Sequence, residues 1–443
     1  MKMSGFEWQA ASQSSFSKCI YMPRSFLLPF ALACFILHGG VCFVSAQSAP
    51  DPVFEKPLPA TLTEWAKTPI RGVRAAEVND YAPALFKGSL EACPPHADHN
   101  PRKAVIVGWE KAAQRLVFSH EASYVPWLEL PNGAGLCNQF FEANNGWGEL
   151  FNAPGRRERN SFVDIIESGP ERAWVRWNYF CVQSNDDSRP ALRGTEDYIA
   201  YPNGLVWRRL TYTSLMPDKP EGYSWQPLDF FAVAPNGTQW KDLFTRDAEH
   251  SDYCVAVVLD AYSDRQYRVF WDDQGKPRRE GDKDLLAGIA KSKGFAMVMP
   301  FQQGCEFLIL GEASGFPATK SQIVDHSFND TGGWGWKAVR WDHWPVGWLN
   351  SQSHEIQADS PYPYHFGPLS HYIVDPPLVD GPRDYPLRAA DMALNRWSER
   401  HVYYTLTGVA KDLTPIRRLA KQWLDKGPAC AKPESIADLS ENK

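Results

Sequence analysis

The middle of the sequence is dominated by short segments in which apolar and polar residues alternate. Between Arg172 and Tyr179, for example, Ala173, Val175 and Trp177 fall on one side of an extended chain, and the intervening residues fall on the other. A period of two indicates β-strands with one buried face. A chain made of many such segments is expected to build packed antiparallel sheets.

Tight turns join these segments. Thr195–Tyr201 and Leu205–Tyr212 flank the turn Pro202-Asn203-Gly204, in which Asn-Gly suits the positive φ angles of a hairpin. Successive strands joined by short turns predict an antiparallel meander, so we expect a mainly β fold. Further strands are predicted at Val105–Val107, Ala113–Phe118, Ser161–Glu167, Cys254–Asp260, Tyr267–Trp271, Phe295–Pro300 and Phe307–Leu310.

Helices are expected to be few. A short one is predicted at Leu62–Ala66 and a weak one at Asp282–Lys291. The strongest signal is Thr414–Trp423, where Thr-Pro supplies the N-cap and first helical position and Gly427-Pro428 ends the helix. Its apolar residues share one face: Ile416, Leu419, Ala420 and Trp423.

The composition fits a globular protein and excludes several classes. Of the 443 residues, 44% are hydrophobic and 22% are charged, which excludes a disordered chain, a collagen-like fibre and a coiled coil. The net charge of −6 argues against a non-specific nucleic-acid binder, because that function needs a basic surface.

The N-terminus is typical of a secretory signal peptide. Arg24 precedes an apolar stretch from Phe26 to Val44, and the small residues that follow suggest cleavage after Ala46. Pro, His and Gly residues interrupt the stretch, which disfavours the alternative of a membrane anchor. We therefore expect a secreted or periplasmic protein without a membrane span after cleavage. Losing residues 1–46 removes three basic residues and one acidic residue and changes the net charge from −6 to −8.

Export would place the remaining cysteines in an oxidising compartment. An even number permits disulfides, and at least one is predicted. Buried thiols are the alternative, because a chain this long does not need cross-links. The six cysteines are Cys93, Cys137, Cys181, Cys254, Cys305 and Cys430.

Aromatic residues and histidines are concentrated between residues 326 and 372. Gly and Pro interrupt this region repeatedly, so it is expected to be largely loop and to form a binding surface. Flat aromatic rings edged by polar groups suit the apolar faces and polar rims of sugars. The alternative is a satellite core of Trp packed beneath a loop. The region contains His326, His343, His354, His365, His371, Trp334, Trp336, Trp341, Trp344 and Trp348.

A second group of polar and aromatic residues precedes the central strands. His120 and Trp127 lie near the end of one predicted strand, followed by Trp147 and by three arginines within Arg156–Arg159. The arginines could neutralise a carboxylate or sulfate, and a solvated loop with local ion pairs is the alternative.

Metal and nucleotide chemistry is not predicted. His96-x-x-His99 and the pair Asp342-His343 are possible ligand pairs, but the sequence contains no HExxH, EF-hand loop or Cys/His array. No cofactor is expected. A structural calcium ion held by scattered Asp residues is left open.

Two segments carry a resemblance to known proteins. Val163–Tyr179 and the following TEDYIAYPNGLVWRRLTY resemble the paired strands of the galactose-mutarotase-like supersandwich, over about residues 100–410. That large antiparallel β-sandwich occurs in aldose epimerases, in several glycoside hydrolases and in many polysaccharide lyases. Arg340–His354 also resembles a stretch in uncharacterised secreted proteins of polysaccharide-degrading bacteria. No catalytic residue can be transferred from these resemblances, and a fold does not prove catalysis.

The sequence is expected to comprise four regions: a signal peptide at 1–46, a Pro-rich lead-in at 47–100, a carbohydrate-active β-sandwich at 101–428 and a polar tail at 429–443. We favour a lyase that cleaves a uronic-acid polysaccharide by β-elimination, because His, Tyr and Arg can supply that chemistry without a cofactor. A glycoside hydrolase or epimerase and a non-catalytic carbohydrate-binding protein remain alternatives. The polymer and the oligomeric state cannot be derived from the sequence.

Specific roles follow for this lyase. His343 is the preferred base, His120 the competing base and Tyr364 the acid. Arg340 and Arg157 would neutralise the substrate carboxylate, which His354 would orient. The expected sugar-binding aromatic residues are Trp341, Trp348, Trp127 and Trp147.

Overall fold

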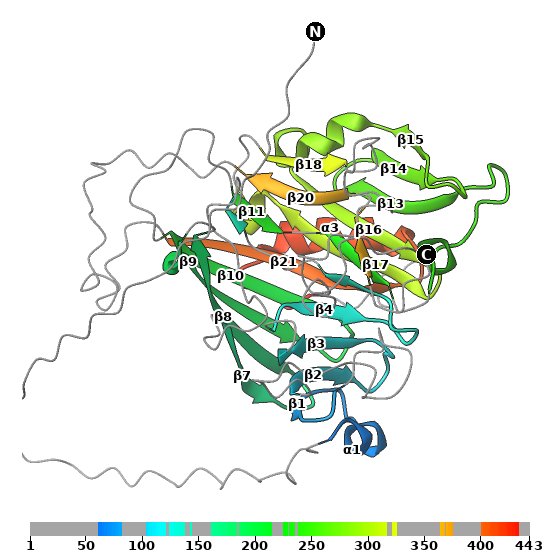
Figure 1. The fold of residues 1–443 in the computed structure, drawn as a ribbon. Helices are drawn as coiled ribbons and strands as arrows, with labels where there is room; N and C mark the ends of the chain where they lie inside the picture. Colours follow the sequence, from blue (N-terminus) through cyan, green and yellow to red (C-terminus); the bar gives the residue numbers. More distant parts are fainter. Residues whose placement is uncertain are drawn as a thin grey trace, which may run out of the picture. The chain divides into compact units, whose positions relative to one another are not determined.

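The strands of the protein pair into three antiparallel sheets (Figure 1). A computed structural model describes residues 61–81, 103–120, 124–137, 142–143, 161–183, 186–214, 225–228, 230–234, 238–316, 321–325, 364–367, 369–374 and 400–433. All of them belong to the unit Lys56–Lys443, one of two units into which the chain divides. The prediction of a mainly β fold with large antiparallel sheets is confirmed.

The largest sheet has ten strands in the order β15-β14-β13-β16-β17-β21-β10-β9-β8-β7. Two consecutive meanders meet at β21, which comes from the end of the chain and pairs with β10 on one side and β17 on the other. The bounds are β7 Ser161–Ser168, β8 Ala173–Gln183, β9 Asp186–Ala200, β10 Val206–Ser214, β13 Tyr253–Asp260, β14 Gln266–Trp271, β15 Pro277–Gly281, β16 Gly294–Phe301, β17 Gly304–Gly311 and β21 Arg400–Ala410.

The second sheet has seven strands in the order β1-β2-β3-β4-β5-β12-β19. Its first strand comes from the segment predicted to be a Pro-rich lead-in, so the sheet begins before residue 101. The bounds are β1 Val73–Val78, β2 Ala104–Trp109, β3 Arg115–Ser119, β4 Pro126–Glu129, β5 Gly135–Cys137, β12 Phe231–Ala234 and β19 Tyr364–Phe366.

A third, smaller sheet has the order β18-β20-β11-β6. Together with β19, its strand β20 places regular structure in the region that was expected to be largely loop. The bounds are β6 Glu142–Ala143, β11 Trp225–Leu228, β18 Ser321–Asp325 and β20 Leu369–Val374.

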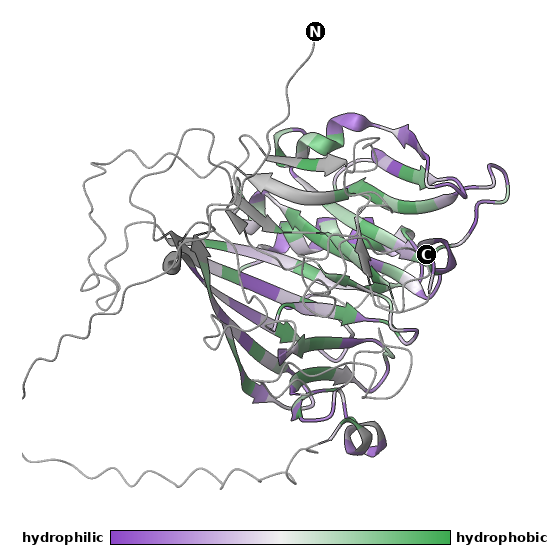
Figure 2. Cartoon of the chain, in the orientation of Figure 1, coloured by the Kyte–Doolittle hydropathy of each residue, from purple (hydrophilic) through white to green (hydrophobic). Residues whose placement is uncertain are grey.

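The alternation predicted for β8 determines which side chains are buried. Ala173, Val175 and Trp177 are fully buried, whereas the residues between them are partly exposed. Figure 2 shows the same alternation of hydrophobic and hydrophilic residues along β7 and β8. The buried face joins a large core that also takes side chains from the seven-stranded sheet, so these two sheets form the layers of a sandwich.

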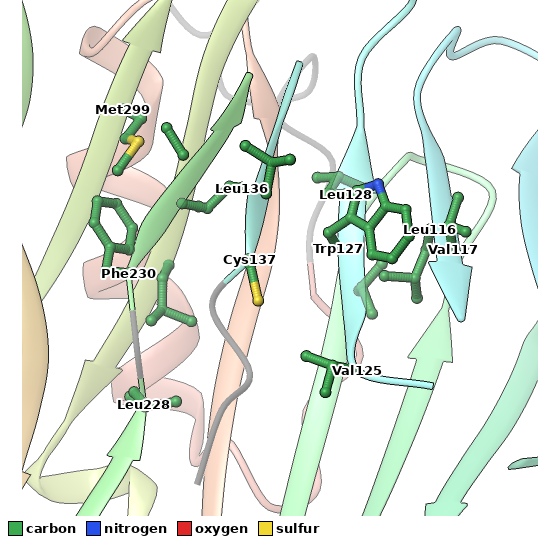
Figure 3. Packing of buried hydrophobic residues seen from close by; sticks show 14 of the residues in the cluster. Leu116, Val117, Val125, Trp127, Leu128, Leu136, Cys137, Leu228, Phe230 and Met299 are labelled. Atoms are coloured by element: carbon green, nitrogen blue, oxygen red, sulfur yellow. The ribbon is translucent and has the colours of Figure 1, made fainter. Parts of the chain in front are cut away.

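The core between the sheets is made of aliphatic, aromatic and sulfur-containing side chains. Met299 of β16, Leu128 of β4 and Leu136 of β5 belong to one buried cluster, which Figure 3 shows at close range. Most members of this cluster are less than 5% exposed. We call the surface of the ten-stranded sheet that points into this core its inner face.

A second core lies on the opposite, outer face of the ten-stranded sheet. There the apolar side of α3 (Thr414–Lys426) packs against β16 and β17 (Figure 1). Leu413, and not the predicted Thr414, occupies the N-cap position, and Thr414 N–H donates to the Asp412 carboxylate at 2.9 Å. The predicted apolar stripe is confirmed, since Ile416, Leu419 and Trp423 are buried.

The other described helices are short. The predicted helix near residue 62 is confirmed as α1 (Leu62–Lys67), where the Thr61 hydroxyl accepts from Glu64 N–H at 3.1 Å. The weak helix signal at 282–291 corresponds to the 3₁₀ helix η5 (Lys283–Ala290), and two shorter 3₁₀ helices are η4 (Trp240–Leu243) and η6 (Glu312–Ser314). In the part of the chain that the structure describes, no helix is long and apolar enough to cross a bilayer.

The cysteines differ from the disulfide prediction. No disulfide joins any two of the five described cysteines, and Cys93 lies outside the described residues. Burial raises the pKa of Cys254 to about 12 and that of Cys305 to about 11, so the half-buried Cys254 and the buried Cys305 are protonated thiols. The core of a sandwich this large holds them without a cross-link.

Candidate functional site

Four polar side chains gather on the inner face of the ten-stranded sheet, where an apolar core is expected. They are Tyr179 of β8, Glu196 and Tyr198 of β9 and Arg208 of β10, and each is at most 1% exposed. We call these four residues the inner-face network. Buried charges of this kind need partners, because an isolated ion in a protein interior is strongly destabilising.

The Glu196 carboxylate is the centre of the network. Arg208 binds it with two parallel hydrogen bonds, Nε to Oε2 at 2.6 Å and Nη2 to Oε1 at 2.7 Å. The Tyr179 hydroxyl donates to Oε1 at 2.8 Å, and the Tyr198 hydroxyl donates to Oε2. The carboxylate therefore accepts four hydrogen bonds from three side chains, which fixes its position in the core.

Strand register brings these residues together. Arg208 lies opposite Tyr198, and Glu196 lies opposite Trp177. Opposite residues in an antiparallel pair share one face of the sheet. Gly194 completes the arrangement, because a Cβ atom there would lie 2.2 Å from Cζ of Tyr179. Glycine at this position leaves space for the Tyr179 ring.

The electrostatics keep both phenols protonated. Burial raises the pKa of Tyr179 and that of Tyr198 well above the usual value of 10.0, and the nearby Glu196 charge raises both further. Burial alone would lower the pKa of Arg208, but the Glu196 charge more than offsets it and leaves the pKa of Arg208 raised. The network thus combines a permanent cation with two proton donors.

Three buried polar atoms beside the network have no hydrogen-bond partner among the described residues. They are Nη1 of Arg208, Oγ1 of Thr405 and Nε1 of Trp177. Thr405 on β21 lies directly opposite Arg208, so two of these atoms belong to neighbouring side chains. Buried polar atoms normally find a partner, so this part of the inner face can bind a further polar group.

The facing sheet approaches the network through β3. The Phe118 ring packs edge-on against Tyr198, with ring centroids 5.2 Å apart. His120 follows two residues later and continues the strand register, since its N–H donates to the Lys103 carbonyl at 2.9 Å. Its ring packs against Tyr124 with centroids 5.4 Å apart. His120 therefore lies just beyond the end of β3, two residues after Phe118, whose ring contacts Tyr198.

Of the predicted site residues, His120 is the one that directly follows a strand in contact with this network, through Phe118 and Tyr198. Trp127 is fully buried and lies opposite Val117, on the other face of the seven-stranded sheet from Phe118. It packs with Tyr81 as a core residue, so the prediction that it forms a sugar platform does not fit this structure. Tyr364 is the first residue of β19, and the structure describes its backbone but not its side chain. The remaining predicted residues also lie outside it: His343, His354, Arg340, Arg157, Trp341, Trp348 and Trp147.

A fifth ionisable group on the inner face stands apart from the network. Glu306 of β17 is fully buried, and neither carboxylate oxygen makes a hydrogen bond of normal geometry with another described residue. Burial raises its pKa well above the usual value of 4.5, although the nearby Leu136 amide of the facing sheet opposes this shift. Glu306 is therefore a protonated acid in the core.

One cluster among the described residues has metal-type ligands, Asp247, His250 and Asp252. The Arg278 guanidinium already binds the Asp252 carboxylate with two hydrogen bonds, Nε to Oδ2 at 2.6 Å and Nη2 to Oδ1 at 3.0 Å. Asp247 Oδ1 accepts backbone N–H groups from Glu249 and His250. These bonds use both oxygens of Asp252 and one oxygen of Asp247, so the cluster offers far fewer free oxygens than the roughly six to eight that calcium takes.

The comparisons with known proteins add little to this picture. No family model matches the sequence, and no curated protein matches it. Among solved structures, galactose 1-epimerase from Lactobacillus acidophilus NCFM is similar, with 10% identity, a TM-score of 0.30 and coverage of 77% of this chain and 100% of the epimerase chain. At this TM-score the likeness carries no argument about the chemistry of this chain.

Proposed function

We propose that the protein is a carbohydrate-active enzyme, a lyase that cleaves a uronic-acid polysaccharide by β-elimination at the inner-face network. The observation that supports this proposal most is the unpaired Nη1 of Arg208, a buried cationic donor beside two protonated phenols. β-Elimination needs these functions, because the uronate carboxylate must be neutralised and the leaving oxygen must receive a proton.

The proposed reaction uses three side chains. Arg208 Nη1 binds the substrate carboxylate, which acidifies the C5 proton. His120, as the proposed base, removes that proton, the C4–O bond breaks, and a C4=C5 double bond forms. Tyr198 turns its hydroxyl from Glu196 to the leaving oxygen and donates its proton. His343 stays a prediction as an alternative base, as do the other predicted residues outside the description.

The network is buried, so the proposal requires the layer over it to open when the polymer binds. Bound oligosaccharide should then change the exchange of backbone amides in β3 and β9 with deuterated solvent. An unchanged exchange pattern at saturating oligosaccharide would contradict substrate entry at this site.

Glycoside hydrolysis is less well supported by the described carboxyl groups. It needs two carboxyl groups about 5–9.5 Å apart. Glu196 and Glu306 lie on β9 and β17, three strand spacings apart in the ten-stranded sheet. At about 4.8 Å per spacing, their backbones are separated by about 14 Å or more. This pair therefore does not have hydrolase geometry.

The test incubates the protein with a panel of uronic-acid polymers. The new double bond is detected by its ultraviolet absorbance. Tyr198→Phe removes one hydroxyl and should lower kcat by about 10²–10⁴-fold, and His120→Ala should do the same. Tyr404→Phe is the matched control, because Tyr404 stacks on Trp207 on the outer face of the same sheet. Near-wild-type turnover by both Tyr198→Phe and His120→Ala would refute the site.

The alternative of a binding protein has its own outcome. Retention on a uronate polymer without product from any polymer would replace the lyase with a carbohydrate-binding function. We also propose that the protein is exported, on the basis of its N-terminal sequence. N-terminal sequencing of the exported protein should then begin at Gln47.

A further inference from the structure

A cavity of about 540 Å³ opens on the outer face of the ten-stranded sheet, away from the inner-face network. It lies between α3 and the strands β13 and β14, and its floor includes Leu259 and Ala261, which belong to the outer core. Its volume falls within the range of about 300–1,000 Å³ that is usual for small-molecule sites. We call this cavity the α3 groove.

The lining of the α3 groove is basic, although Lys421 is paired with Asp425 beside it. Arg268, Arg417, Arg418 and Lys421 line it, against a single acidic residue, Asp264. Arg417 is already committed, because it donates to the Asp260 carbonyl at 3.1 Å and to Asp264 Oδ1 at 3.1 Å. These bonds fasten α3 to the turn between β13 and β14 and leave Asp264 neutralised.

Arg268 is the cation best placed for a ligand. Its Nη2 donates to Gln266 Oε1 at 3.2 Å, but its Nε is buried and has no hydrogen-bond partner within the described part of the chain. Glu280 lies opposite Arg268 on β15, and it is paired with Arg278. A guanidinium with an unused buried donor is suited to a carboxylate or sulfate.

An exposed aromatic ring lies at the rim of the groove. Tyr262 is 38% exposed, and Lys421 Nζ is 5.2 Å from its ring centroid. Burial and the Asp425 charge raise the pKa of Tyr262 to about 12, and its hydroxyl donates to Asp425. The ring is therefore held in place beside the basic lining, as a sugar platform would be.

We propose that the α3 groove binds a short anionic oligosaccharide, with a carboxylate at Arg268 and a sugar ring against Tyr262. The choice of a uronate as the anion rests on the proposed function, whereas the cavity and its charge do not. When one segment of a polymer binds in the α3 groove, it is held on the outer face of the sheet. Another segment of the same polymer can then bind elsewhere on the protein.

The test titrates trigalacturonate into the full chain and measures affinity by calorimetry and solvent access to Tyr262 by hydroxyl-radical footprinting. Trigalacturonate should protect Tyr262, and neutral maltotriose should not. Arg268→Gln should weaken binding about tenfold or more and abolish the protection. Lys276→Gln is the charge-matched control, since Lys276 is exposed in the turn between β14 and β15, outside the groove lining, and should leave both readouts unchanged. Tyr262→Ala, a surface change, should also weaken binding.

Several results would overturn this proposal. One is that trigalacturonate does not protect Tyr262 from hydroxyl radicals. Another is that Arg268→Gln and Lys276→Gln weaken the binding of trigalacturonate equally. A third is that sodium sulfate alone protects Tyr262 fully, which would show an adventitious ion only. The two proposals can fail separately. Protection that survives in Tyr198→Phe supports the α3 groove even if no polymer is cleaved, and cleavage without protection supports only the inner-face site.

Discussion

Replacing Arg208 with Met tests whether the inner-face network is held by its ion pair. The substitution removes two charge-assisted hydrogen bonds, 2.6 and 2.7 Å long, and leaves the fully buried Glu196 with only two phenol donors. Hydrogen bonds to charged groups contribute about 1.5–3 kcal/mol each. Breaking one partner of a buried pair costs about 3–5 kcal/mol. We expect Arg208→Met to lower the free energy of unfolding by about 3–5 kcal/mol in chemical denaturation at pH 7.

The neighbouring residue on the same strand gives the matched control. Arg209 points to the outer face, where it is 37% exposed and donates to Asp197 Oδ2 through Nε at 3.0 Å. Asp197 would keep its bonds from Arg176 and Trp174, so Arg209→Met should cost about 1 kcal/mol or less.

A double variant distinguishes the ion pair from simple packing. Combining Arg208→Met with Glu196→Gln removes the uncompensated charge, and most of the lost stability should return. A cost for Arg208→Met no larger than that of Arg209→Met would refute the reasoning, as would a double variant no more stable than the single one.

Three further predictions follow from described side chains. Because the pKa of Glu306 is raised, the folded protein keeps a proton that the unfolded chain loses above about pH 4.5, so this group destabilises the fold as pH rises. Glu306→Gln should therefore flatten the fall in stability between pH 5 and pH 8, by about 1.4 kcal/mol for each unit of pKa elevation, in denaturation curves measured across that range. Gly194→Ala should cost about 1–3 kcal/mol of unfolding free energy, because its Cβ would lie 2.2 Å from the Tyr179 ring. Cys254, with a pKa of about 12, should not react with a thiol reagent at pH 8 in the folded protein, whereas the exposed Cys430 should.

These predictions have simple controls and clear failures. Gly169→Ala should be nearly neutral, since the nearest atom to its Cβ is 3.8 Å away, and equal losses at both glycines would contradict the steric argument. A parallel pH dependence of Glu306→Gln and wild type would show that Glu306 ionises normally. Mass spectrometry of unreduced, alkylated and unfolded protein should find no cross-link among the five described cysteines.

Much of the fold could be predicted because one-sided burial leaves a pattern in the sequence. The predicted bounds of β7, β8, β10 and β13 agree with the structure within a few residues, and β7 and β8 show the alternation that one-sided burial produces. The strand β21 was not predicted, because it is buried on both faces: Tyr403, Thr405 and Thr407 face the inner core, and Leu406 faces the outer core. A strand that is buried on both sides shows no alternation.

The inner-face network was missed for a related reason. Glu196 and Asp197 are adjacent, charged and both buried, so the sequence of β9 does not show which of them points into the sandwich. The alternation of side chains along a strand could have identified it. Glu196, Tyr198 and Ala200 are two residues apart and therefore share one face, and Tyr198 and Ala200 belong to the buried core. His120 stays a prediction as a site residue, and it was selected because a histidine at a strand end is visible without knowing the register.

The position of β21 also affects how the protein is made. This strand closes the gap between β10 and β17, yet it is encoded by residues 400–410, near the end of the chain. During synthesis the strands β7–β10 and β13–β17 leave the ribosome first and present two unpaired edges, which are sites where other chains can add. Only when residues 400–410 emerge can β21 join the two halves, and α3 then packs on the outer face against β16 and β17. A nascent chain that stalls before residue 400 thus contains two half-sheets with unpaired edges. We expect chaperones to be needed in this state, because those edges can pair with other chains.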